Sequence, residues 1–175
     1  ASDELIGEVS AGAKHSRVFY AMVVLSTVVA AAGLMQSSAA VIIGAMVIAP
    51  LLGPNLALAL ALTVGDLKLA RTALITNISG VLLASLLAIA FGFFAQVDPS
   101  TPEIMSRTIP KPSDIAIALG AGAAGTLAAT TGVPAALVGV MVAVALLPPL
   151  VSFGLLLVSR DATVTQALGA LMLTL

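Results

Sequence analysis

Long apolar segments alternate with short polar stretches along almost the whole chain. The first five segments are close to the ~20 residues that a helix needs to cross the hydrocarbon core of a bilayer. We expect transmembrane helices over residues 17–35, 39–64, 72–94, 113–131, 134–158 and from 163 onward. The stretch from 163 to 175 makes only about 20 Å of helix at the usual rise per residue, so we expect this last span to be truncated. The pattern predicts an all-α integral membrane fold with about six spans.

The polar stretches divide the chain into four regions. Residues 1–16 predict a polar, amphipathic helix, which we expect to end a soluble domain that precedes Ala1. Residues 17–96 hold the first three spans. Residues 97–112 form a polar linker with four prolines, and residues 113–175 hold the last three spans.

One segment occurs twice. Residues 41–66 and 136–161 align without gaps and are identical at nine of 26 positions, where about three matches are expected from so biased a composition. The more informative identities are Gly44/Gly139, Met46/Met141, Pro54/Pro149 and Asp66/Asp161. Because the repeating unit has three spans, the second copy enters the membrane from the opposite side. The sequence therefore predicts two inverted three-helix repeats.

Each copy has prolines at mid-length. Proline removes a backbone N–H and clashes with the preceding turn, so we expect the second helix of each repeat to be broken. Unpaired backbone groups cost several kcal/mol each in hydrocarbon, and two such breaks would line a polar cavity near the midplane. The candidate solute or ion pathway comprises Pro50, Gly53, Pro54, Asn55, Pro148 and Pro149. The alternative is that the prolines only kink helices to shape their packing.

Several other polar and small residues allow a structural as well as a functional interpretation. Asp66 and Asp161 are the only acids that the repeat duplicates, and they would either stand at opposite mouths of the pathway or lie as structural groups at the membrane interface. Asn77 is expected to make an interhelical hydrogen bond. The small residues of span four, including Gly120, Gly122 and Gly125, predict close helix packing and a central position for that span.

Composition excludes several classes of protein. The chain is 60% hydrophobic and 9% charged, with a mean hydropathy of +1.18, whereas soluble domains carry about 25% charged residues. A net charge of −1 provides no basic patch for nucleic acid. Cysteine is absent and His15 is the only histidine. We therefore expect no enzymatic activity, no catalytic residues, no cofactor and no metal site.

The basic residues favour one orientation. With a cytoplasmic N-terminus, the inner side would hold Lys14, Arg17, Lys68 and Arg71, and the outer side Arg107, Lys111 and Arg160. Four against three is a weak positive-inside bias. The span interiors contain no ionisable residue, whereas proton-coupled carriers generally need one. A solute would therefore be held by backbone groups, Asn, Ser and Thr.

Three motifs resemble a known family. They are Ser38–Pro54 (SAAVIIGAMVIAPLLGP) followed by Gly65-Asp66, then Gly120–Gly125 (GAGAAG), then Gly139–Pro149 (GVMVAVALLPP). In this order they are similar to the prokaryotic membrane family described as domain of unknown function 389, over about residues 14–175. The resemblance implies a multi-span protein of the inner (cytoplasmic) membrane, often with a soluble N-terminal domain, and it implies no assigned activity.

Three functions remain open from the sequence. The first is a transporter that moves a small solute or ion through a midplane site between two broken helices. The second is a channel at the centre of an oligomer, and the third is a membrane anchor or sensor for a soluble N-terminal domain. The expected partners are the lipid bilayer, an unidentified small solute or ion and further copies of the chain in a homo-oligomer, without nucleic acid.

Overall fold

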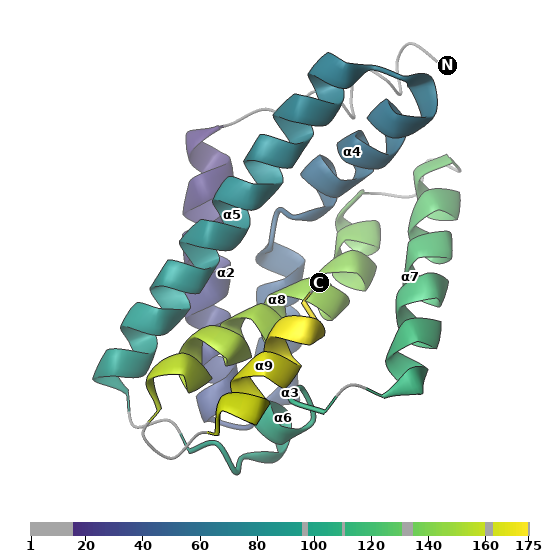
Figure 1. Cartoon of the computed structure of the whole chain (residues 1–175). Coiled ribbons are helices and arrows are strands. Elements are labelled where there is room, and N and C mark those ends of the chain that lie inside the picture. Colours follow the sequence, from purple (N-terminus) through teal and green to yellow (C-terminus); the bar gives the residue numbers. More distant parts are fainter. Residues whose placement is uncertain (1–15, 96–97, 110, 131–134, 160–162, 175) are drawn as a thin grey trace.

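The computed structural model describes residues 16–95, 98–109, 111–130, 135–159 and 163–174, and over these residues its regular structure is entirely α-helical (Figure 1). The helices are α2 (Arg17–Met35), α3 (Ala39–Ile48), α4 (Leu52–Val64), α5 (Leu67–Phe94), α6 (Pro102–Met105), α7 (Pro112–Thr130), α8 (Ala135–Val158) and α9 (Val164–Met172). The all-α prediction is confirmed for these residues.

Helices α2 and α3 form a tight hairpin at the predicted position. The hydroxyl of Ser16 caps α2 by accepting a hydrogen bond from the N–H of Phe19 at 3.0 Å. After α2, the chain turns through Ser37, whose φ is +50°. The two helices approach closely at Gly33, where a Cβ would lie 2.9 Å from Ile42 Cγ1. The glycine therefore sets how near α3 lies to α2.

The predicted break in the second span is confirmed. Helix α3 ends at Ile48 because Ala49 takes an extended ψ of 120°, and α4 begins at Leu52. The axes of Ala39–Ile48 and Gly53–Val64 differ by 54°. Proline at position 50 explains the break, since it offers no N–H and disfavours the helical conformation for the residue before it.

The predicted break in the fifth span is wrong. Helix α8 runs from Ala135 to Val158 with Pro148 and Pro149 inside it, and its ribbon changes direction at mid-length rather than unwinding (Figure 1). Both prolines are buried within the helix. The first copy differs because it holds Pro50, just after the end of α3, where the aligned position of the second copy holds Ala145.

The helices alternate in direction (Figure 1). We refer to the end that holds the Gly65 turn as the upper end and to the end that holds α6 as the lower end. Helices α2, α5 and α8 run downward, whereas the α3–α4 pair, α7 and α9 run upward. The first half of the chain thus starts at the upper end, and α7 starts at the lower end.

Among the described helices, α2 and α5 are long and apolar enough to cross a membrane, and the bent α3–α4 pair makes a third if it counts as one span. About six spans were expected. The apolar helices support membrane association, and they account for two or three of the expected spans. Helix α5 has 28 residues, about 42 Å at the usual rise. It is longer than the ~30 Å hydrocarbon core, and its first turns carry the exposed Lys68 and Arg71.

One large buried cluster joins the two halves of the chain. It contains residues of α2, α3, α5, α6, α8 and α9, together with Ala49 and Leu51 from the break. Helix α8 supplies Leu147, Val151 and Leu155, each at most 1% exposed. The second half of α8 is therefore the centre of the fold.

Helix α7 lies at the edge of the fold instead of at its centre (Figure 1). Its apolar side chains point outward, with Ile115 66% and Leu119 70% exposed. A Cβ on Gly120 or Gly122 would meet nothing within 4 Å. The prediction of a central span packed on all sides is wrong, because composition shows that a helix allows close packing but not where its partner lies.

Candidate functional site

The break between α3 and α4 is the best candidate site in the described part of the chain. The N–H of Ala49 donates to the carbonyl oxygens of Ala45 and Met46, at 3.1 and 3.3 Å. Pro50 has no N–H, and α4 starts without a side-chain cap. The carbonyl end of α3 and the N–H end of α4 therefore meet here, with partial charges of opposite sign.

Protein covers part of this break. Leu51 is 3% exposed, and Pro54 is buried as well. On α5, a Cβ on Gly80 would lie 3.0 Å from the Phe19 ring and 3.8 Å from Leu51 Cδ2. The absence of a side chain at Gly80 lets α2 and the break pack directly on α5, so the unwound turn is shielded from lipid on this side.

An amide pair links the start of α4 to the middle of α5. The side-chain amide of Asn77 donates a hydrogen bond to Oδ1 of Asn55. Both residues are half-buried. The predicted interhelical bond of Asn77 is confirmed, and its partner is Asn55, the residue expected to supply an amide beside the break. The polar groups of both residues thus lie together within an otherwise apolar region.

A second polar contact lies on the other side of α5. The Tyr20 hydroxyl and Ser79 Oγ are 3.0 Å apart and join α2 to α5. Ser79 Oγ also donates to the carbonyl of Thr76 at 2.9 Å, and Thr76 Oγ1 donates to the carbonyl of Thr72 at 3.0 Å. Polar side chains in this part of α5 are therefore satisfied by their own helix or by a neighbouring one.

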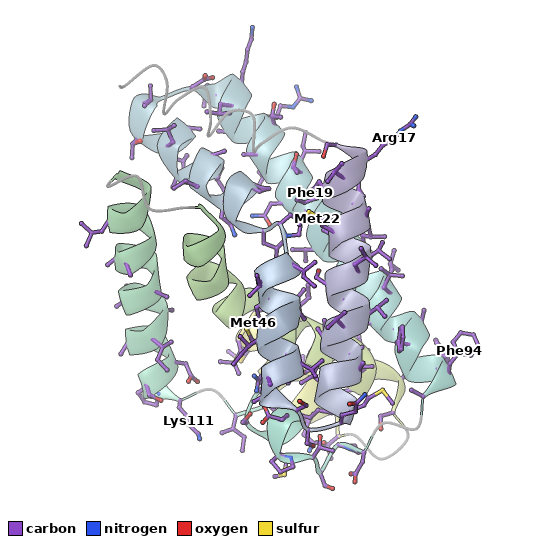
Figure 2. All side chains as sticks on the ribbon, turned by 180° about the vertical axis from the view of Figure 1, so that it is seen from behind. Arg17, Phe19, Met22, Met46, Phe94 and Lys111 are labelled. Atoms are coloured by element: carbon purple, nitrogen blue, oxygen red, sulfur yellow. The ribbon has the colours of Figure 1, made fainter. Side chains whose placement is uncertain are left out.

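The duplicated prolines of α8 lie in the same region. Leu147, which precedes them, shares the large buried cluster with Ala49 and Leu51 of the break. Figure 2 shows Met46 of α3 on the side that faces α8. The structure thus brings the first proline break and the second proline pair into one core, although only the first interrupts a helix.

Sequence reasoning missed Ser152. This serine is fully buried, and its Oγ has no hydrogen-bond partner among the described residues. It follows Pro148 by four positions, one helical turn. The signal available in the sequence was a hydroxyl one turn after a proline pair, in a segment otherwise free of polar side chains.

The remaining candidate residues either bond only to their own helix or lie outside the described residues. Asp66 caps α5, and its Oδ1 accepts from the N–H groups of Lys68 and Leu69 at 2.9 and 3.1 Å. Asp161 lies outside the described residues, as do the surroundings of Gly125. The described residues contain no group of three acidic, histidine or cysteine side chains able to hold a metal ion.

The charged groups of the lower end lie in the connector. Arg107 Nη1 is 3.3 Å from Glu103 Oε2. Burial lowers the pKa of Arg107, while Glu103 opposes that shift. Hydrogen bonds from the side chain and backbone of Ser100 lower the pKa of Asp98. None of these groups lies at the α3–α4 break, which is formed by neutral residues.

Comparisons with known proteins agree with the motifs. The family model described as Domain of unknown function (DUF389) matches residues 46–175. The chain is 41% identical over 173 residues to an uncharacterised protein of Methanocaldococcus jannaschii, in a match that covers 99% of this chain and 53% of that protein. The chain thus spans about half the length of this relative. No solved structure matches it. With the family model covering most of its length, the chain belongs to the family of domain of unknown function 389.

Proposed function

We propose that this protein is a multi-pass membrane carrier that moves a small polar solute or a cation through a site at the α3–α4 break. The observation that carries the proposal is an interrupted apolar helix, with Ala49 and Leu51 of the break buried and an amide pair beside the interruption. A helix break inside a membrane persists only where protein, water or a ligand satisfies its backbone groups. Broken helices of this kind form the binding sites of several transporter folds.

The direction of the helices supports an inverted repeat. The first half of the chain descends, ascends and descends, while α7, α8 and α9 ascend, descend and ascend (Figure 1). Together with the duplicated segment around Gly44 and Gly139, this order is the one expected of two three-helix units of opposite orientation. Their cores share one buried cluster, as a site between two repeats requires.

The chemistry of the break indicates the class of solute. No ionisable side chain lies in the apolar segments around it, so recognition falls to backbone carbonyls, backbone N–H groups and the amides of Asn55 and Asn77. These groups suit a neutral polar solute or a cation held by carbonyl oxygens. Proton coupling through a carboxyl or imidazole group within the membrane has no residue to carry it.

The basic residues support an orientation in the prokaryotic inner membrane with the upper end in the cytoplasm. Arg17, Lys68 and Arg71 belong to the upper end, and Arg107 and Lys111 to the lower end; Figure 2 shows Arg17 and Lys111 at opposite ends. Among the described residues, three positive charges stand at the upper end against two at the lower end, which follows the positive-inside rule weakly. On this assignment α6 faces the outside of the cell.

The first test uses the absence of cysteine from the chain. We would introduce Ala49→Cys at the break and measure its reaction with a charged, membrane-impermeant methanethiosulfonate reagent in sealed membrane vesicles. Ala84→Cys is the matched control, because Ala84 is similarly buried, 2% against 6% exposed, but packs against Phe19, Val23 and Leu150 in a buried cluster separate from that of Ala49. The carrier proposal predicts that Ala49→Cys reacts and Ala84→Cys does not.

The two sides of the membrane then separate the possible functions. A carrier exposes Ala49→Cys to the reagent from either side, with rates that change when solute is added. A channel exposes it from both sides at the same time, and an anchor or sensor leaves it unreactive. Equal protection of Ala49→Cys and Ala84→Cys in both right-side-out and inside-out vesicles would refute an aqueous pathway through the break.

A further inference from the structure

The connector between the halves folds into a compact unit at the lower end of the bundle. We refer to residues 98–109, with α6 at their centre, as the α6 segment (Figure 1). Ile104 is 0% exposed and Thr108 is 6% exposed, and Pro99 is buried too. A polar linker that served only to join two repeats would not place an isoleucine entirely inside the protein.

The hydrogen bonds of the α6 segment form within it, and one hydroxyl, Thr101 Oγ1, is buried without a partner among the described residues. Asp98 accepts from the backbone and hydroxyl of Ser100 at 2.8 and 2.6 Å. Arg107 Nη1 donates to Glu103, to its carbonyl oxygen at 3.1 Å and to its carboxylate at 3.3 Å. The backbone bonds recorded from Thr101 to Thr108 also close within the segment. Among the described residues, its hydrogen bonds therefore stay inside the unit.

The α6 segment meets the bundle through apolar contacts and close backbone packing. Ile104 belongs to the large buried cluster, with Ala167 and Ala170 of α9. The carbonyl of Thr108 lies against Gly169 so closely that a Cβ there would clash with it. Among the described residues, no hydrogen bond joins the unit to the helices, so its release separates the apolar contacts of Ile104 and the backbone contact of Thr108 with Gly169.

The position of Ile104 connects this contact to the break. The buried cluster that contains Ile104 also contains Ala45 of α3 and, above it, Ala49 and Leu51 of the break. Ile104 therefore stands at the lower end of the apolar core whose other end is the α3–α4 break.

We propose that the α6 segment is a plug that closes the lower mouth of the pathway, with Ile104 as its stopper. The proposal rests on the function proposed for the break. The plug moves out as one unit held together by its own hydrogen bonds and by the Arg107–Glu103 ion pair. Its release opens the lower mouth, and its return buries Ile104 again.

The test measures reagent access to the break from the lower side. In the Ala49→Cys chain, Ile104→Val removes one buried carbon group and Ile104→Ala removes three. At the usual free energy per buried group, the released state becomes about fourfold more populated for valine and on the order of 60-fold for alanine. We expect the rate of modification from the lower side to rise in that order, with no rise from the upper side.

Ile109→Ala is the matched control, because Ile109 lies in the same segment but is 56% exposed; it should leave the rate unchanged. Ser100→Cys and Lys68→Cys, both at exposed positions, identify the lower and upper faces of each vesicle preparation. The graded valine variant tests the plug even if the alanine variant fails to fold.

Two failures are distinguishable. If Ala49→Cys reacts from the lower side equally fast with Ile104, valine or alanine, the plug is refuted while the pathway stands. If Ala49→Cys stays unreactive from both sides in every variant, the pathway itself is absent and the proposed function fails with it.

Discussion

The amide pair between Asn55 and Asn77 provides the sharpest test of the packing around the break. Replacing either residue by alanine removes the bond between α4 and α5 and leaves a half-buried amide without its partner. Interhelical hydrogen bonds of polar side chains in membrane proteins contribute on the order of 1 kcal/mol. Because both residues are only half-buried, we expect a coupling energy of about 0.5 to 1 kcal/mol, toward the lower part of the usual range.

The assay is a double-mutant cycle with Asn55→Ala, Asn77→Ala and the double variant, since a cycle isolates the pairwise energy. Unfolding in mixed detergent and dodecyl sulfate micelles can be followed by the fluorescence of Tyr20. It is the only tyrosine, and the chain has no tryptophan. Tyr20 contacts Ser79 of α5, so its emission senses whether α2 and α5 remain packed.

Ser85→Ala is the matched control for this cycle. Ser85 is a polar residue of α5 whose hydroxyl bonds only the Val81 carbonyl of its own helix, at 2.8 Å. It should show no coupling to Asn55→Ala. A coupling energy between Asn55 and Asn77 that is indistinguishable from this control would show that the two amides do not bond, and the structural account of the break would need revision.

Three further outcomes follow from the geometry. Asp66→Ala should lower the free energy of unfolding by about 1 kcal/mol through the loss of the α5 cap, with Asp66→Asn retaining most of it in the same micelle assay. Gly169→Ala should displace the α6 segment and speed modification of a cysteine at the break from the lower side, whereas Gly120→Ala, which meets open space, should not. Ser100→Ala should raise the pKa of Asp98 in a carboxyl NMR titration, because it removes the hydroxyl donor that lowers this pKa. The pKa of Asp98 in the folded state is depressed below 3.8. Its contribution to stability is therefore present above that pH and is lost as the pH falls through the depressed value. An unchanged pKa of Asp98 in the Ser100→Ala variant would contradict the role of the Ser100 hydroxyl.

The sequence predicted well the features that depend on a few neighbouring residues. The bounds of α2, the tight turn after it and the break at Pro50 all matched. A proline at a helix end acts through its own covalent geometry, so its effect could be anticipated without knowledge of distant residues. The apolar pattern likewise determined that the chain forms long helices suited to a bilayer.

Features that depend on distant partners came only from the tertiary structure. Pro148 and Pro149 were expected to break their span, and only the structure showed that α8 continues through them with both prolines buried. Asn77 was expected to find a partner, but only the fold showed that this partner is Asn55.

The same distinction explains the two larger surprises. The small residues of α7 permit close packing, yet α7 lies at the edge, because composition specifies what a surface allows and not which helix occupies it. The linker at 97–112 is polar by composition, yet Ile104 within it is fully buried. The sequence by itself determined that the chain is apolar and helical, where α2 begins and ends, and one break. The tertiary structure decided which apolar faces meet, because burial energy depends on contacts between segments far apart in the chain.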